Sequence, residues 1–121
     1  MASTENKFMS AGSRYPERRT AARFAFSAEA QIHEPVERMS MAGLVTTISK
    51  RGCFVKVRTP LNSGTVMKVR IQNGDASFET WARVADQRSK LTDGMALVFF
   101  GTAPEQVQIL ESWLENLAPN R

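Results

Sequence analysis

Apolar and polar residues alternate strictly from Phe24 onward. Apolar side chains fall on one face of this stretch, and small or polar residues fill the other. A period of two over this length is typical of a strand with one buried side, and Glu34 and Pro35 end it. The sequence therefore predicts a first strand whose core face consists of Phe24, Phe26, Ala28, Ala30 and Ile32.

Turn-forming residues divide the rest of the alternating region into shorter segments. Asn73-Gly74 is the strongest hairpin signal, because both residues tolerate the positive φ of a type I′ turn. Asp93 and Gly94 mark a further turn, and the segment after them is apolar on both faces, so we expect it to be central. Five more strands are thus predicted, at residues 43–49, 53–57, 65–71, 76–85 and 95–100.

After residue 101 the apolar period changes to that of a helix. Thr102 and Glu105 have the T-x-x-E spacing of a capping box, which satisfies free N–H groups at a helix start. Trp113 widens the apolar stripe that follows, and Pro119 ends it. The stripe consists of Val107, Leu110, Leu114 and Leu117. Such a stripe must be buried, so we expect the helix to cover the open end or the side of the sheet.

This order of elements predicts an all-β fold with a C-terminal helix, in the form of a six-stranded antiparallel β-barrel. A β-α-β rhythm is missing, which argues against a doubly wound fold. At 121 residues, the chain is expected to contain a single domain. Residues 1–16 lack periodicity and are expected to be a flexible N-terminal arm, with the domain at residues 17–118.

Composition and charge narrow the class of protein. No apolar run is long enough to span a bilayer, and the start lacks the apolar region of a secretory signal. The single cysteine, Cys53, fits the reducing cytoplasm, where we expect the protein to lie without inserting into a membrane. Net charge is +4, and residues 1–60 carry ten Lys or Arg against five Glu. This excess either indicates an anionic partner or serves solubility alone.

No set of residues in the sequence indicates catalysis. His33, the single histidine, lies on the polar face of the first strand with no obvious acidic or nucleophilic partner for catalysis. Cys53 lies on an alternating apolar face, as a buried structural thiol does. Metal-ligand spacings, a P-loop and a G-x-S-x-G motif are missing. We therefore expect a binding protein that is not an enzyme and holds no cofactor or metal.

One polar cluster is rich in arginine. Arg18, Arg19 and Arg23 lie where the chain enters the first predicted strand. The spacing of Arg19 and Arg23 lets both guanidinium groups converge on one site when this connection is bent. Guanidinium can bind phosphate or the O6/N7 edge of guanine bidentately, and it can stack on a base. The alternative interpretation is a solvated basic linker.

A second cluster, TISKRG, lies between the second and third predicted strands. A strand that ends in Ser49-x-x-Gly52 makes a tight turn with free backbone N–H groups and a hydroxyl, a geometry that favours anions. Lys50 and Arg51 add positive charge at the same tip. The alternative interpretation is an ordinary basic hairpin turn.

Together the clusters resemble the PilZ domain family, the bacterial receptors for cyclic di-GMP. The family pattern is R-x-x-x-R before the first strand and [D/N]-x-S-x-x-G further along. Residues 19–23 match the first motif, and residues 47–52 match the second except at Thr47. The resemblance covers roughly residues 17–117 and implies a barrel of the split-barrel type.

The resemblance also implies a non-catalytic nucleotide sensor. Arg19 and Arg23 would grip guanine edges and phosphates while the arm around them wraps the ligand, and Arg18 would add a stacking or phosphate contact. Ser49 and the backbone near Gly52 would line the other side of the site. The ligand-binding set is Arg18, Arg19, Arg23, Thr47, Ser49, Lys50, Arg51 and Gly52.

Thr47 departs from the family pattern, which usually has a carboxylate or amide there. A threonine hydroxyl can accept from one guanine N–H group but cannot form a bidentate pair. Losing such a pair costs about 1–3 kcal/mol. The substitution therefore weakens nucleotide binding or abolishes it.

The resemblance and the chain length together imply an adaptor that signals to an unidentified protein partner when its arm closes, without DNA or RNA as a partner. One alternative is a degenerate module that binds protein but not nucleotide, suggested by Thr47 and by an expected loop with Met39 and Met41. Another is a binder of single-stranded nucleic acid, which the assignment of Phe24 and Phe26 to the core disfavours. The pathway stays open, as does binding of one nucleotide or a stacked pair.

Overall fold

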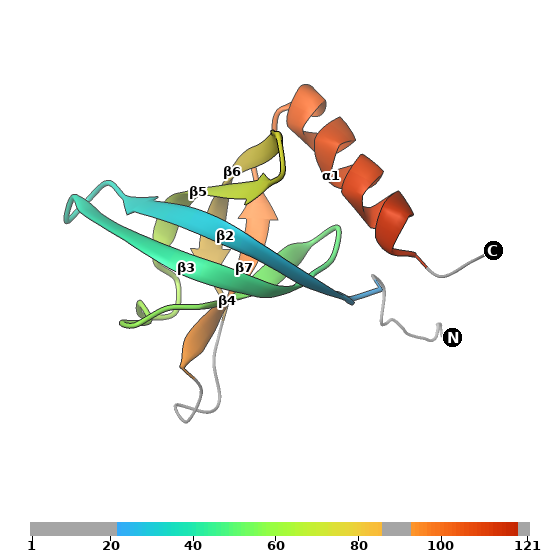
Figure 1. The fold of residues 1–121 in the computed structure, drawn as a ribbon. Coiled ribbons are helices and arrows are strands. Elements are labelled where there is room, and N and C mark those ends of the chain that lie inside the picture. The colour runs from blue at the N-terminus through green and yellow to red at the C-terminus, as the bar shows by residue number, and fades with distance from the viewer. Residues whose placement is uncertain (1–21, 86–92, 119–121) are drawn as a thin grey trace, which may run out of the picture.

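The computed structural model describes residues 22–85 and 93–118. In these ranges antiparallel strands close into a barrel in the order β2–β3–β4–β7–β6–β5, and one helix follows them (Figure 1). The predicted six-stranded barrel with a C-terminal helix is therefore confirmed. The elements are β2 (Phe24–Glu34), β3 (Met39–Ile48), β4 (Gly52–Lys56), β5 (Val66–Asn73), β6 (Ala76–Val84), β7 (Gly94–Phe100) and α1 (Pro104–Leu117).

The inward faces of the strands fill the barrel. In β2, Ala28, Ala30 and Ile32 are buried and alternate with exposed residues, as predicted. Cys53 on β4 is also buried, as expected for a structural thiol. Removing these apolar side chains from water is the main favourable contribution to folding. The largest fully buried side chains include Phe78, Ile48, Met67, Ile71 and Met95.

Helix α1 packs over the end of the barrel where β2 begins (Figure 1). Trp113 is 6% exposed, and its ring centroid lies 5.5 Å from that of Phe26 and 6.1 Å from that of Phe78. The backbone N–H of Glu79 on β6 donates to Oε1 of Gln106 at 2.7 Å and ties the helix to the sheet. The predicted apolar stripe is therefore the face with which α1 covers the barrel.

The start of α1 differs from the prediction. Ala103 is the N-cap residue and makes no side-chain capping bond, and Pro104 follows in the first turn. The hydroxyl of Thr102 lies 2.6 Å from that of Thr80 in the barrel wall. The predicted capping box of Thr102 and Glu105 is therefore wrong. Thr102 hydrogen-bonds to the barrel instead, and a proline in the first turn has no N–H group that needs a cap.

The hairpin between β5 and β6 uses a different pair of turn residues than predicted. Asn73 pairs with Ala76, so the two-residue turn consists of Gly74 and Asp75. Gly74 has a φ of +63°, whereas Asp75 has no positive φ. This is the type II′ arrangement, not type I′, and it needs glycine at its first central position.

Strand β3 begins at Met39, earlier than predicted. Met41 is partly buried against the core, and Met39 lies opposite Glu34 on β2. The Glu34 carboxylate accepts the backbone N–H groups of Val36 and Glu37, each at 2.8 Å, and so stabilises the turn that starts β3. The expected methionine loop is therefore wrong, because both methionines belong to a paired strand.

Candidate functional site

Arg23 connects the two sequence motifs. It comes directly before β2, whose Ala25 lies opposite Thr47 on β3. Nη1 of Arg23 donates to Oγ1 of Thr47 at 3.1 Å. Arg23 is exposed and Thr47 half-buried, so this contact lies at the protein surface. The structure thus brings the last arginine of R-x-x-x-R to the first position of T-x-S-x-x-G.

Arg18 and Arg19 lie outside the described residues, so their place in the site stays a prediction. The covalent chain nevertheless limits where Arg19 can be. An extended chain spans at most about 3.6 Å per residue, so the Cα atoms of Arg19 and Arg23 are separated by no more than about 14 Å. This limit is compatible with the prediction that both arginines contact one small ligand.

Ser49 holds the turn between β3 and β4 from the inside. It is 3% exposed, and its backbone N–H donates to the carbonyl oxygen of Gly52 at 2.8 Å. Its Oγ accepts the N–H groups of Arg51 at 3.2 Å and of Gly52 at 3.3 Å. A serine hydroxyl commonly stabilises a turn in this way. The expectation that these two N–H groups are free for an anion is therefore wrong.

Gly52 allows β7 to approach the same turn closely. A Cβ atom at Gly52 would overlap the carbonyl oxygen of Leu97. The N–H of Phe99 donates to the carbonyl oxygen of Arg51 at 2.9 Å, which fixes the turn to β7 at a second point. The serine and glycine of the motif thus shape the tip, and the exposed Arg51 side chain is available to a ligand.

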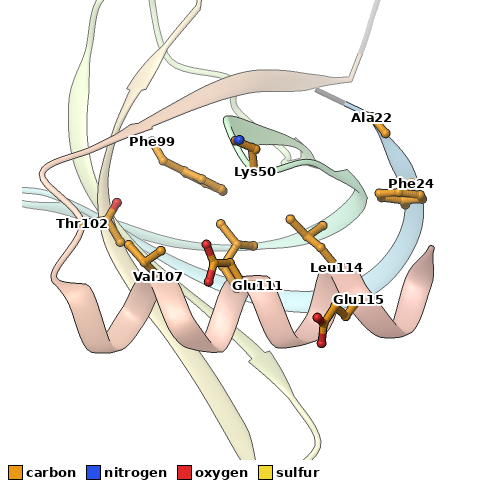
Figure 2. Close-up of a pocket in the computed structure, with 10 residues that line it drawn as sticks. Ala22, Phe24, Lys50, Phe99, Thr102, Val107, Glu111, Leu114 and Glu115 are labelled. Carbon is orange, nitrogen blue, oxygen red and sulfur yellow. The ribbon is translucent and has the colours of Figure 1, made fainter. Parts of the chain in front are cut away.

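Lys50 lines a groove that Arg23 and Thr47 do not line. The groove has a volume of about 480 Å³ and lies between the start of β2, the β3–β4 turn and α1 (Figure 2). Glu111 and Glu115 of α1 also line it. Its apolar lining consists of Ala22, Phe24, Phe99, Val107, Leu110 and Leu114.

Phe24 belongs to the wall of this groove. It is half-buried at the rim of the barrel, whereas Phe26 packs on Trp113. The prediction that Phe24 is a core residue is therefore wrong, because alternation identifies the inward face but not where the core ends. Sequence reasoning also misses Glu111 and Glu115, although their spacing of four places them on one side of a helix.

The residues considered for catalysis have structural roles. Burial raises the pKa of Cys53 from 9.0 to about 12, and the nearby Arg23 guanidinium opposes part of this rise. A thiol that stays protonated is a poor nucleophile. Nδ1 of His33 lies 3.1 Å from Oγ of Ser40 at the surface. Within residues 22–85 and 93–118 no three His, Cys, Asp or Glu residues group in a way that could hold a metal ion.

In the part of the chain that the structure describes, no helix has both the length and the apolar character needed to cross a bilayer.

Several solved structures have a similar barrel. The PilZ domain of YcgR from Escherichia coli, determined with c-di-GMP, is 13% identical with a TM-score of 0.66, over 84% of this chain and 92% of that one. The inhibitor of motility MotI/DgrA from Bacillus subtilis is 20% identical with a TM-score of 0.68, over 88% and 55%. The PilZ domain of CeSA from a cellulose-synthesizing bacterium is 15% identical with a TM-score of 0.61, over 78% and 98%. This chain thus matches nearly the whole of two PilZ domains and about half of MotI/DgrA.

The family follows from the sequence itself. No curated protein has a significant match to the chain, but the PilZ domain family model matches residues 17–116. This range includes both motifs, every described strand and all but the last residue of α1. The motifs, the barrel and the family match agree. The chain therefore belongs to the PilZ domain family.

Proposed function

We propose that this protein is a receptor for cyclic di-GMP and not an enzyme. The observation that carries the proposal is the hydrogen bond from Arg23 to Thr47, which joins the two motifs at one surface site. Membership of the PilZ family supports it. The YcgR domain with a similar fold was solved with c-di-GMP, which also supports it.

Arg23 is suited to hold an anionic nucleotide. Its side chain is exposed, and the bond to Thr47 is the one hydrogen bond it makes to the described residues. A guanidinium carries five N–H donors, so most of them remain for phosphate oxygens or for the O6/N7 edge of guanine. Arg19 supplies a second guanidinium group to the same nucleotide, and Arg18 adds a stacking or phosphate contact.

The β3–β4 turn forms the other side of the proposed site. Ser49 acts mainly by holding the turn in shape, because its hydroxyl is buried and already bonded to the turn backbone. Gly52 acts through the space that it leaves for β7. Arg51 reaches the ligand from the tip, and Lys50 adds positive charge beside it.

Binding would draw the residues before Arg23 over the nucleotide and so change the protein surface. We propose that an unidentified protein partner reads this change and that the chain acts as an adaptor in the cytoplasm. A single unpaired, buried cysteine suits that reducing compartment. DNA and RNA are not proposed as partners.

A second candidate function is a protein-binding module that has lost the nucleotide. Thr47 favours it, because its hydroxyl already accepts from Arg23 and cannot give guanine a bidentate acceptor pair. The methionine loop no longer supports it, because Met39 and Met41 lie in β3. The two candidates differ in whether cyclic di-GMP binds at all.

Isothermal titration of the full chain with cyclic di-GMP separates them. We expect binding that Arg23→Ala weakens by about 5- to 150-fold, the equivalent of one lost bidentate contact. Arg58→Ala is the matched control, because Arg58 is exposed and follows the other end of β4. A flat wild-type titration would favour the protein-binding module, and equal losses in both variants would reject the proposed site.

A further inference from the structure

Two glutamates of α1 occupy electrostatically unfavourable positions. Glu111 and Glu115 are four residues apart, and like charges at this spacing destabilise a helix. Glu115 lies in the last turn, near the negative end of the helix dipole, and that turn contains no basic residue. Neither carboxylate has an ion-pair partner within 4.0 Å among residues 22–85 and 93–118. A cation supplied from elsewhere would offset these repulsions.

Both glutamates lie at the groove between α1 and the barrel. Figure 2 shows them on the helix, with Lys50 across from it and apolar side chains between. Lys50 contributes one positive charge against two negative ones, so the rim keeps a net negative charge. An apolar hollow beneath such a rim suits an aromatic side chain that is flanked by cations.

The chain supplies a segment of this chemistry directly beside the groove. Ala22, the first described residue, lines the groove, so the preceding residues start at its edge. Residues 14–21, RYPERRTA, contain three arginines, one glutamate and one tyrosine. At about 3.6 Å per residue at most, Arg18 lies within about 14 Å of Ala22 and Tyr15 within about 25 Å, measured between Cα atoms.

We propose that residues 14–21 dock in this groove when no nucleotide is bound. Tyr15 occupies the apolar hollow, and Arg18 and Arg19 pair with the two glutamates of α1. Cyclic di-GMP then competes for these arginines, so that binding releases the segment and uncovers the acidic side of α1. The release rests on the proposed function, whereas the docking needs no nucleotide.

Paramagnetic relaxation in the full chain tests the docking. A nitroxide is attached to the variant Ser13→Cys, since the native Cys53 is buried and its pKa of about 12 keeps it unreactive at neutral pH. We expect several-fold stronger broadening of the methyl signals of Leu110 and Leu114 than of those of Val36. β2 runs for 11 residues, roughly 35 Å, between the groove and the turn that holds Val36.

Charge-neutral variants test the pairing. Glu111→Gln combined with Glu115→Gln should remove the selective broadening, as should 1 M salt, where the Debye length falls to about 3 Å. Glu105→Gln removes one charge from α1 outside the groove and is the matched control for Glu111→Gln and Glu115→Gln measured singly. Even broadening over the barrel, or equal effects of the groove and control variants, would overturn the docking.

Two further measurements test whether the docking occurs within one chain and whether the nucleotide releases the segment. Broadening that passes from a labelled chain to an unlabelled one would assign the groove to a second copy and overturn the proposal. Cyclic di-GMP at saturation should abolish the selective broadening, and broadening that persists while the nucleotide binds would overturn the release. A flat titration with selective broadening intact would reject the proposed function and leave the docking supported.

Discussion

Replacing Thr47 with aspartate should restore the acceptor pair that this chain lacks. In the structure Thr47 offers Arg23 one hydroxyl oxygen at 3.1 Å. A carboxylate at this place can accept two guanine N–H groups at once, and a good bidentate base contact contributes about 1–3 kcal/mol. The same carboxylate would form an exposed ion pair with Arg23, contributing up to about 1 kcal/mol, that the ligand must partly displace.

The difference between these effects predicts tighter binding. Thr47→Asp should lower the Kd for cyclic di-GMP by about 5- to 30-fold, the equivalent of about 1–2 kcal/mol. Isothermal titration in one buffer compares it with the wild type. Thr46→Asp is the matched control, since it adds the same charge one residue earlier, and repulsion of the phosphates should weaken its binding. A Thr47→Asp protein that binds no more tightly than the wild type would refute the reasoning.

Three further predictions concern the fold that supports the site. Gly52→Ala should lower the free energy of unfolding in urea by about 1–3 kcal/mol, because its Cβ displaces the Leu97 carbonyl; unchanged stability would disprove the close approach. Trp113→Ala should lower the free energy of unfolding by about 3–5 kcal/mol in the same assay. A decrease of only about 0.5 kcal/mol, as is typical of an exposed residue, would show that α1 is not packed on the barrel. Burial holds the pKa of Cys53 at about 12 against 9.0, so above pH 9 only the unfolded chain loses that proton. As the pH rises above 9, the free energy of unfolding of the wild type should therefore fall more steeply than that of Cys53→Ala, by about 1.4 kcal/mol per pH unit. Parallel curves of unfolding free energy against pH for the two proteins would contradict the burial of Cys53.

Alternation along the sequence was enough to predict the barrel, because the inward faces are mostly apolar and the outward faces, except that of β7, are largely polar. The start of β3 was missed, since the alternation of Met39, Ser40 and Met41 is too short to separate a strand from the polar loop before it. The bounds of that strand depend instead on Glu34, whose buried carboxylate holds the preceding turn. Such a tertiary role is not visible in local sequence.

Local motifs were less reliable than periodicity. Thr102 has the spacing of a capping residue, but its hydroxyl binds Thr80, which is distant in sequence. Asn73-Gly74 correctly indicates a hairpin, yet cross-strand pairing sets the turn one residue later. For the candidate site, the sequence identified both motifs, and the structure shows the contact between Arg23 and Thr47. The groove beside α1 could not be predicted, because it forms between Phe24, Lys50 and a helix from the other end of the chain.

Chemical-shift mapping of the full chain with cyclic di-GMP tests the central claim most directly. We expect the largest amide shifts at Arg23 and at residues 47–52, with little change at Val36 at the far end of β2. This outcome would locate the nucleotide at the two motifs joined by Arg23. Saturating cyclic di-GMP that shifts no resonance, or shifts that centre on the turn around Val36, would contradict the assignment of this protein as a cyclic di-GMP receptor that binds through these residues.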